Sequence, residues 1–367
     1  MAIPRRSRNR HGGPTNGALA EALFALSETE PPGDRRMALL RAGYAAFDTP
    51  GVAQKAALHG SPQWLKPVIS QLADCPGEGA LEAAVQRLAN SATPRRRGSR
   101  ERFLSRAEVS AVLASGSDEL QPQRIRGAFH WHTSDSDGKA SLEMMARACR
   151  RRGSAWAMVA DHSRGLDIAS GLDREGVRLQ RQRVDRWNGE HGDELRLLQG
   201  LEVEVLEDGT VDVPPGERIE VDCIIAAVHR QFDSGRDQTE RLLRAVSTPG
   251  VHALAHPRGR LFHHRPGVRA RWEKVFTACA EHGIAVEING FPRRQDLDWE
   301  LARLACELGC DFVVASDAHA VPHLDFDAYA VAIAVKAGIP PTRILNAGQV
   351  ENFEAWLAER QSKVTLL

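Results

Sequence analysis

The stretch GAFHWHTSDSDGKAS, residues 127–141, ends an apolar run with two histidines and follows them with two aspartates. Side chains alternate between the two faces of an extended chain, so we expect His130 and His132 to point to the same side. That arrangement suits a metal ion. The run SDSDG is also rich in turn formers, so a solvated turn accounts for Asp135 and Asp137 without any metal. From this stretch alone, a metal site and a plain turn remain alternatives.

Short apolar runs rich in β-branched residues recur after residue 125 and alternate with amphipathic helical stretches. Alternation of strand and helix predicts a parallel sheet with helical crossovers. Seven such units favour a closed or nearly closed α/β barrel over a sandwich, with an open doubly wound sheet as the alternative. The predicted strands are residues 125–132, 155–162, 195–205, 222–229, 252–257, 285–290 and 311–319.

Potential metal ligands stand at the ends of six of the seven predicted strands. They are His130 and His132, His162, Glu202, His229, His256, and Asp317 with His319, while Glu287 and Asn289 take the matching place on the sixth strand. The carboxyl ends of barrel strands form one rim, so these residues are expected to converge on one pocket. The chain has only 14 histidines, which makes chance placement a poor explanation. Cysteine is absent from these positions, so nitrogen and oxygen ligands for Zn, Mn or Fe are predicted.

The composition is that of an ordinary globular protein, with 42% hydrophobic and 26% charged residues in 367. The longest apolar runs are too short for a membrane span, and the first residues do not resemble a secretory signal, so we expect a cytoplasmic protein. Six scattered cysteines without any CxxC indicate reduced thiols. The sequence contains no GxSxG and no P-loop, which argues against a serine nucleophile and a nucleoside-triphosphate mechanism.

The front of the chain is basic and short-helical. Residues 1–126 hold 18 Lys and Arg against 12 Asp and Glu. Charge runs of this kind are more often solvated linkers than nucleic-acid contacts. The expected organisation is a basic flexible tail at 1–16, a small all-α domain at 17–94, a basic linker at 95–124 and the α/β barrel at 125–361.

The ordered motifs resemble those of the PHP (polymerase and histidinol phosphatase) superfamily over nearly all of residues 125–360. The motifs are HWHTSDSDG, ADHS, GLEVEV, AAVH, AHPRGR, VEING and SDAH. Details such as EDGTVDVP and VEINGFPRRQDLD resemble the C-terminal PHP domain of bacterial family X DNA polymerases, here without the polymerase part. The N-terminal helices faintly resemble the small DNA-binding domain of those polymerases but carry no convincing helix-hairpin-helix turn. The resemblance implies a distorted seven-stranded (β/α) barrel with up to three divalent metal ions, Zn, Mn or Fe.

The same resemblance implies a ligand set. One ion would be held by His130, His132, Glu202 and Asp317, a second by Glu202, His229 and His256, and a third by Asp137, His162 and His319. We expect Glu202, Asp317 and His319 to be catalytic. Arg258 and Arg260, directly after AHP, are candidates for binding substrate phosphate, with solvated loop arginines as the alternative.

The predicted function is a metal-dependent phosphoesterase in which a metal-activated hydroxide attacks phosphorus. We expect a 3′–5′ exonuclease or an enzyme that processes DNA 3′ ends, because the family resemblance and segments such as PRRRGSRERFLSR favour nucleic acid. The zero net charge and the aromatic content of 5% argue against it. The alternatives are a small-molecule phosphomonoesterase of the histidinol-phosphatase kind and a non-catalytic, metal-stabilised scaffold.

Overall fold

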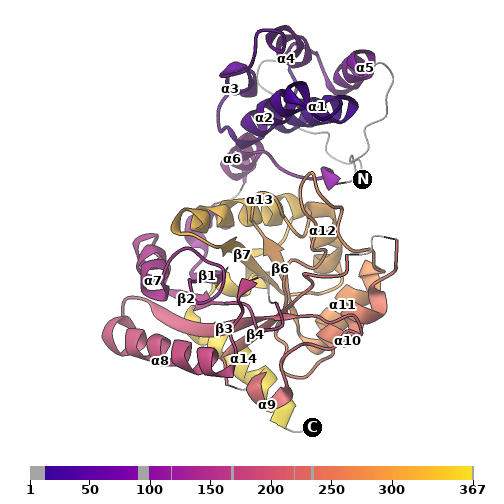
Figure 1. Ribbon diagram of the computed structural model, residues 1–367. Coiled ribbons are helices and arrows are strands. Elements are labelled where there is room, and N and C mark those ends of the chain that lie inside the picture. Colours follow the sequence, from indigo (N-terminus) through magenta and orange to yellow (C-terminus); the bar gives the residue numbers. More distant parts are fainter. Residues whose placement is uncertain are drawn as a thin grey trace. The chain divides into compact units, whose positions relative to one another are not determined.

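The computed structural model describes residues 13–89, 99–116, 118–166, 169–218, 220–232 and 235–365. The chain divides into two compact units (Figure 1). A helical unit comprises Met1–Ser115 with Phe262–Arg265, and a barrel unit comprises Gly116–Leu261 with Pro266–Leu367. Most of the basic tail predicted over residues 1–16 lies outside the described residues. In the described part of the chain, no helix combines the length and the apolar character needed to cross a membrane.

Short helices around a small core make up the helical unit. Its helices are α1 (Asn16–Thr29), α2 (Asp34–Asp48), α3 (Ala53–Leu58), α4 (Lys66–Ala73), α5 (Glu78–Leu88) and α6 (Arg106–Ser115). Helix α1 begins where the Thr15 side chain accepts a hydrogen bond from the amide of Ala18. Phe262 belongs to this core, with its ring centroid 4.6 Å from that of Phe47. The segment predicted to be a linker, 95–124, contains α6 and the buried Arg100, which pairs with Glu28.

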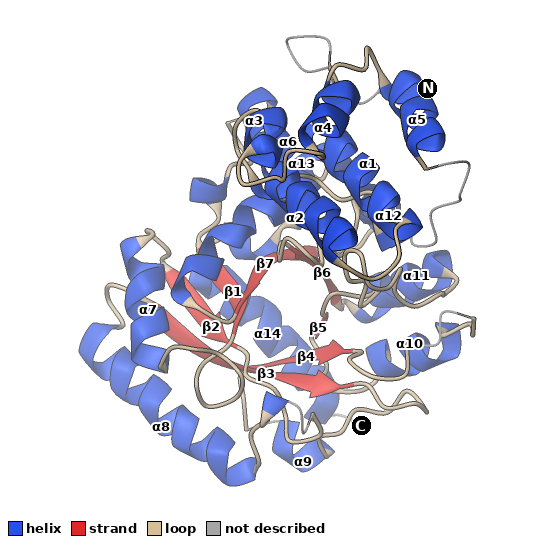
Figure 2. Ribbon diagram, turned by 45° about the horizontal axis from the view of Figure 1, so that its top comes forward, coloured by secondary structure: helices blue, strands red, loops and turns tan. Residues whose placement is uncertain are grey.

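Seven parallel strands close into a barrel in the described part of the chain, which confirms the predicted fold (Figure 2). The strands are β1 (Gly127–Trp131), β2 (Trp156–Val159), β3 (Arg196–Glu204), β4 (Cys223–Ala227), β5 (Ala253–Leu254), β6 (Ala285–Asn289) and β7 (Phe312–Ala318). Neighbours in sequence pair in order, and β7 pairs with β1 to complete the ring. Their interiors are buried, as expected when helices cover the outside of a parallel barrel.

The helices of the barrel unit follow the strands. They are α7 (Leu142–Arg151), α8 (Arg174–His191), α9 (Pro215–Arg218), α10 (Thr239–Val246), α11 (Trp272–His282), α12 (Trp299–Glu307), α13 (Asp327–Ala337) and α14 (Val350–Thr365), with 3-10 turns η2 (Pro122–Arg124), η4 (Val321–Phe326), η5 (Pro341–Arg343) and η6 (Leu345–Ala347). Side-chain caps begin several of them: Ser141 accepts from the amide of Met144 at α7, and Asp173 accepts from Gly176 at α8.

One end of the barrel is filled by α14. Its Phe353 ring stacks on Trp156 at a centroid distance of 4.5 Å and meets Phe129 edge-on at 5.9 Å. Trp156 is the first residue of β2, so this packing lies toward the amino ends of the strands. Gly127 permits it, because a Cβ there would lie 2.1 Å from the Trp156 ring. The carboxyl end of the barrel remains for the polar residues.

Strand β1 is irregular where its first histidine lies. The pairing registers with β2 and β7 both shift between Ala128 and Trp131, and His130 has a positive φ of 57°. Asp317 in β7 also has a positive φ, at 51°. Non-glycine residues rarely adopt this conformation, and those that do often lie at functional sites. His130 and His132 therefore reach the same pocket by a bulge rather than by the plain strand alternation that the sequence suggested.

Candidate metal centre

All nine side chains predicted as ligands meet at the carboxyl end of the barrel. They are His130 in β1, His132 one residue after β1, Asp137 in the following loop, His162 three residues after β2, Glu202 in β3, His229 two residues after β4, His256 two residues after β5, Asp317 in β7 and His319 one residue after β7. Strand β6 contributes Glu287 and Asn289 to the same end. Parallel strands bring residues nearly 190 positions apart in sequence into one pocket.

The first ligand group comprises His130, His132, Glu202 and Asp317. His130 Nε2 lies 3.3 Å from Glu202 Oε2 and 3.8 Å from Asp317 Oδ1. His132 Nε2 lies 3.2 Å from Asp317 Oδ1 and 3.6 Å from Glu202 Oε2. Two ligands about 2.1 Å from a tetrahedral ion lie about 3.4 Å from each other. The atoms of His130, His132 and Glu202 lie within 4.8 Å of one another and fit a single ion between them, and Asp317 Oδ1 lies beside the two imidazoles.

The second ligand group comprises Glu202, His229 and His256. Here the other carboxylate oxygen is used: Glu202 Oε1 lies 2.8 Å from His256 Nε2 and 3.2 Å from His229 Nε2. Glu202 thus turns one oxygen toward each of the first two groups. Its position is that of a carboxylate able to bridge two ions.

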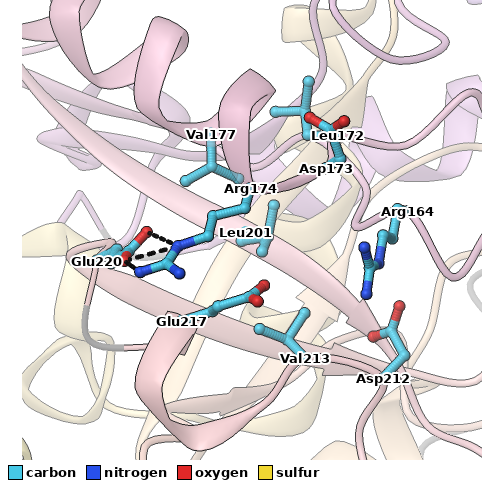
Figure 3. Close-up of a pocket in the computed structure, with 10 residues that line it drawn as sticks. All are labelled: Arg164, Leu172, Asp173, Arg174, Val177, Leu201, Asp212, Val213, Glu217 and Glu220. Carbon is cyan, nitrogen blue, oxygen red and sulfur yellow. Dashed lines mark hydrogen bonds and ion pairs between the residues drawn. The ribbon is translucent and has the colours of Figure 1, made fainter.

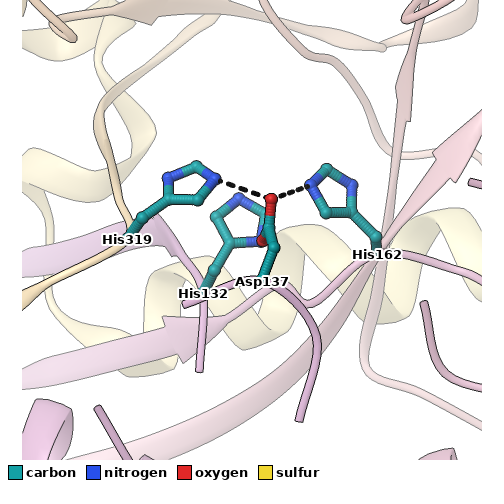
Figure 4. A group of neighbouring side chains, drawn as sticks. All are labelled: His132, Asp137, His162 and His319. Atoms are coloured by element: carbon teal, nitrogen blue, oxygen red, sulfur yellow. Dashed lines mark ion pairs between the residues drawn. The ribbon is translucent and has the colours of Figure 1, made fainter. Parts of the chain in front are cut away.

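The third ligand group comprises Asp137, His162 and His319, with His132 beside them (Figure 4). Asp137 Oδ2 lies 3.3 Å from His319 Nε2 and 3.7 Å from His162 Nε2. His132 Nδ1 lies 3.9 Å from Asp137 Oδ1, so these four residues also offer ligand atoms to a common point. This group is the most open one, because the Asp137 side chain is 34% exposed and that of Glu202 is fully buried.

Buried polar atoms without partners show that the pocket fits metal ions. His130 Nε2, His229 Nε2 and Glu202 Oε2 are buried and have no hydrogen-bond partner of acceptable geometry. Leaving such groups unpaired is unfavourable in a protein interior, and an ion among them would satisfy them together. The set of imidazoles and carboxylates is typical of Zn, Mn or Fe sites.

Electrostatics within the cluster keep its carboxylates ionised. Burial opposes the charged form of Glu202, but the charges of His162, His229 and His130 outweigh it and hold the Glu202 pKa well below its usual range. For His132, burial and then the charges of His162 and His319 lower the pKa to about 3. His132 thus has the neutral imidazole that metal binding requires. At His162, by contrast, burial is outweighed by Glu202 and Asp137, which raise the pKa of His162 to about 10, so an ion at His162 would displace a proton.

Two further carboxylates hold the histidines in place. Glu287 accepts a hydrogen bond from His130 Nδ1 at 2.7 Å and from the amide of His256 at 2.5 Å. Glu204 lies 2.8 Å from His229 Nδ1 and accepts from the His229 amide. A carboxylate on the far nitrogen fixes the tautomer of a metal-binding histidine. Glu287 was recognisable from the sequence at the end of the sixth predicted strand. Glu204 was not predicted, although the spacing of the two glutamates in GLEVEV places both on one face of β3.

The guanidinium groups of Arg258 and Arg260 are both bound to other protein groups. Arg258 pairs with Asp298 at 2.9 Å and donates to the carbonyl of Pro266. Arg260 is buried and donates to the carbonyls of Arg294 and Gln295. Their predicted contact with substrate phosphate stays a prediction.

Arg294 is the arginine that touches the ligand set. Its Nε lies 3.0 Å from Asp317 Oδ2, the oxygen opposite the one that faces the histidines. Asn289 also donates to Asp317 Oδ2, at 3.2 Å. The Arg294 Nη1 atom is buried and has no hydrogen-bond partner. The sequence signal for this residue was the basic pair in FPRRQ after the sixth strand.

A separate pocket lies beside the first turn of α8 (Figure 3). Arg174 spans it to pair with Glu220, and Arg164 lies near Asp212. Asp212 accepts hydrogen bonds from the Ser163 hydroxyl at 2.6 Å and the Glu204 amide at 2.9 Å. This pocket contains none of the nine predicted ligands, and Asp212 links the loop after β2 to β3.

Curated proteins similar to this chain include polymerases and phosphatases. A DNA polymerase/3′-5′ exonuclease PolX from Bacillus subtilis (strain 168) is 33% identical over 235 residues, which are 64% of this chain and 41% of that protein. A "Probable phosphatase" from Thermoanaerobacter sp. (strain X514) is 25% identical over 248 residues, 64% of this chain and 95% of that protein. The chain thus spans less than half of the PolX relative. No family model matches the chain.

One similar solved structure is histidinol phosphate phosphatase from Lactococcus lactis in complex with zinc, L-histidinol and phosphate. The TM-score is 0.43 at 15% identity, with 56% of this chain and 92% of that chain covered. The motif order, the closed seven-stranded barrel and the sequence relatives agree with one another. The chain is therefore a homologue of PolX and of the probable phosphatases, with a closed barrel of seven parallel strands.

Proposed function

We propose that this protein is a metal-dependent phosphoesterase that acts on DNA 3′ ends, as a 3′–5′ exonuclease or a 3′-end processing enzyme. The observation that carries the proposal is the convergence of nine imidazoles and carboxylates at the carboxyl end of the barrel. Seven of them form three overlapping groups whose ligand atoms lie within 4.8 Å of one another. Divalent ions at such a site would supply Lewis acidity, which lowers the pKa of water so that hydroxide is available as the nucleophile near neutral pH, and would offset charge on the phosphate.

The protein residues would hold and orient the reacting groups. Glu202 presents its two oxygens to two ligand groups, so it would keep two ions at a fixed separation. Asp317 presents Oδ1 to the histidines and Oδ2 to Arg294 and Asn289, which favours one-oxygen coordination. Glu204 and Glu287 would keep the imidazoles of His229 and His130 in the orientation that ligation needs.

Arg294 is placed to bind a phosphoryl oxygen. Its Nε is occupied by Asp317, while the buried Nη1 has no partner and is left for a ligand. With three divalent ions bound, their charge and that of Arg294 would exceed the charge of Glu202, Asp317, Asp137, Glu204 and Glu287, which two ions and Arg294 would only balance. A phosphate dianion would offset that excess, and a guanidinium group matches its geometry. Arg260 supports this role indirectly, because it holds the carbonyls of Arg294 and Gln295.

Basic residues near the metal centre support a polyanionic substrate over a small one. Lys139, Arg164 and Arg293 are exposed and follow Asp137, His162 and Asn289, respectively, in the loops at the carboxyl end of the barrel. Cations spread around a pocket attract an extended phosphate backbone, whereas a single phosphomonoester needs only the pocket itself. The similarity to a protein named DNA polymerase/3′-5′ exonuclease supports the same choice.

The test is degradation of a single-stranded DNA oligonucleotide labelled at its 5′ end, in the presence of Mn²⁺. We expect shortening from the 3′ end, blocked by a 3′ phosphorothioate linkage and weakened steeply by salt. Glu202→Gln protein purified in parallel is the control for a contaminating nuclease. No shortening, together with rapid release of phosphate from histidinol phosphate, would decide for the small-molecule phosphomonoesterase that the similarity to phosphatases favours.

A non-catalytic scaffold remains the third candidate. It would bind metal and lose stability on chelation, yet hydrolyse neither substrate nor a generic chromogenic phosphate ester. The buried Nη1 of Arg294 argues against it, because this atom has no hydrogen-bond partner beside the ligand set although Nε is bound to Asp317.

A further inference from the structure

The third ligand group differs from the other two in how it is built. The first and second groups consist of residues in the strands or at most two residues beyond them, whereas Asp137 lies in the loop between β1 and α7. Asp137 and His319 have side chains that are 34% and 23% exposed, against 0% for His130 and Glu202. A ligand on a loop holds an ion only if the loop itself is held.

Asp161 binds this loop through hydrogen bonds to its backbone and side chains. Its buried carboxylate accepts hydrogen bonds from the Thr133 amide at 2.7 Å and the Thr133 hydroxyl at 2.6 Å, and from the hydroxyl of Ser136. Ser136 is the residue immediately before Asp137. The Asp161 carboxylate thus binds the loop at Thr133 and at Ser136, before and within its turn. These residues set the direction of the Asp137 side chain.

A buried amide from α8 completes the shell around Asp161. Gln180 Nε2 donates to Asp161 Oδ2 at 2.6 Å, while Gln180 Oε1 accepts from Gln199 Nε2 at 3.1 Å. Gln199 Nε2 also donates to the carbonyl of Val177, so its amide orientation is set. Gln180 can therefore present only its NH₂ group to Asp161. All four hydrogen bonds to Asp161 come from donors. A carboxylate can accept all four, whereas an amide in its place would have only one accepting atom.

Two more features keep the loop in one conformation. Arg183 on α8 binds Asp135 through Nη1 at 2.7 and 2.8 Å and Glu143 through its other nitrogens. A Cβ on Gly138 would lie 2.6 Å from the carbonyl oxygen of His132, so the loop returns closely onto the strand end. Helix α8 is thus coupled to the loop that carries Asp137 directly through Asp135 and indirectly through Asp161.

We propose that Asp161 is the positioning residue of the third ligand group and that this group forms the weakest, exchangeable metal site of the protein. Asp161 touches neither an ion nor the substrate; it acts through Thr133 and Ser136 on the position of Asp137. This inference rests on the proposed function in one respect, that the cluster binds metal. It goes further in assigning the control of one ion to a residue outside the ligand set.

The test compares metal content rather than activity alone. Wild-type protein and the Asp161→Asn variant are dialysed against decreasing free Mn²⁺ or Zn²⁺ and analysed for bound metal. We expect the variant to lose one equivalent at a free-metal concentration about 10–100-fold higher than wild type does, with its remaining equivalents unchanged. The amide of the variant would set a donor against either the Thr133 amide or the Gln180 NH₂ group, whichever way it is turned. Activity should fall with the lost equivalent and return when Mn²⁺ is raised.

Asp173→Ala is the matched control. It removes the N-cap of α8, where Asp173 accepts from the Gly176 amide, and so weakens the same helix without touching the loop. It should keep the wild-type metal profile. If Asp161→Asn does not fold, Gln180→Leu replaces it, since this change removes one of the four bonds to Asp161 and should weaken the same equivalent.

Three results would count against the inference. Wild-type metal profiles in folded Asp161→Asn and Gln180→Leu would overturn it, and so would loss of all equivalents together from a variant with a native melting temperature. A wild-type protein that binds no metal would overturn the proposed function itself, which is a different outcome from selective failure at Asp161.

Discussion

Replacing Arg294 by alanine should impair phosphate binding far more than metal binding. The guanidinium group is held by Asp317 at 3.0 Å, and its buried Nη1 is left for a phosphoryl oxygen. A hydrogen bond to a charged group contributes about 1.5–3 kcal/mol net. Because about 1.4 kcal/mol corresponds to a factor of ten, kcat/KM should fall about 10- to 150-fold. Asp317 keeps Asn289 as a partner, so metal content should change little.

Steady-state kinetics on a phosphate ester, elemental analysis, and calorimetric titration with inorganic phosphate would check this prediction. The matched control is Arg293→Ala, which removes an exposed cation from the adjacent position. Arg294→Lys should recover part of the loss, because it restores the charge without the fork of donors. An Arg294→Ala enzyme with kcat/KM and phosphate affinity within about threefold of wild type would refute the reasoning, given the charged hydrogen bond it presumes.

Three other predictions concern the ligand set and stability. Glu202→Gln removes the charge shared by two ligand groups. Metal analysis should therefore show the loss of at least one equivalent of metal, and activity assays should show a near-complete loss of activity. Normal metal content together with normal activity would contradict the bridging role of Glu202. Glu204→Gln should lower metal affinity about 10–100-fold through His229, measured by competition with a chelator, and an unchanged affinity would show that the hydrogen bond is dispensable. Burial, with the charge of Arg360, lowers the His252 pKa to about 4 from 6.5, so its contribution to stability is complete above pH 6.5 and is lost as the pH falls to 4. The loss amounts to about 3 kcal/mol; urea unfolding at pH 7 and pH 4 should show it in wild type but not in His252→Gln, and equal losses in both would contradict it.

The barrel and the strand-end positions of eight of the nine predicted ligands followed from periodic signals, whereas Asp137 entered the ligand set through the family resemblance. Each predicted strand is a short apolar run, and each ligand follows at its end, so parallel geometry alone brings them together. The bulge at His130 could not be predicted, since it depends on the pairing of β1 with two different strands. Nothing in the local sequence distinguishes such a residue from one in a regular strand.

The residues that support the ligands were harder to identify. Asp161 precedes a ligand in the motif ADH and resembles a polar residue at a strand end until its four donors are known. Arg294 lies in a loop next to another arginine, and only the fold separates the exposed one from the one beside Asp317. Phe262 belongs to the core of the helical unit although more than 150 residues separate it from the rest of that core. Such contacts have no periodicity that a sequence could display.

The packing of α14 at the amino end of the barrel affects how the protein is completed during synthesis. Every predicted ligand lies before residue 320, whereas the Phe353 ring that packs against Phe129 and Trp156 belongs to α14, Val350–Thr365. A nascent chain in which β7 has just emerged from the ribosome therefore holds all nine ligands but lacks the packing under β1 and β2. Metal loading of the finished geometry becomes a late event of synthesis, and chaperones would meet an open barrel with its apolar interior uncovered.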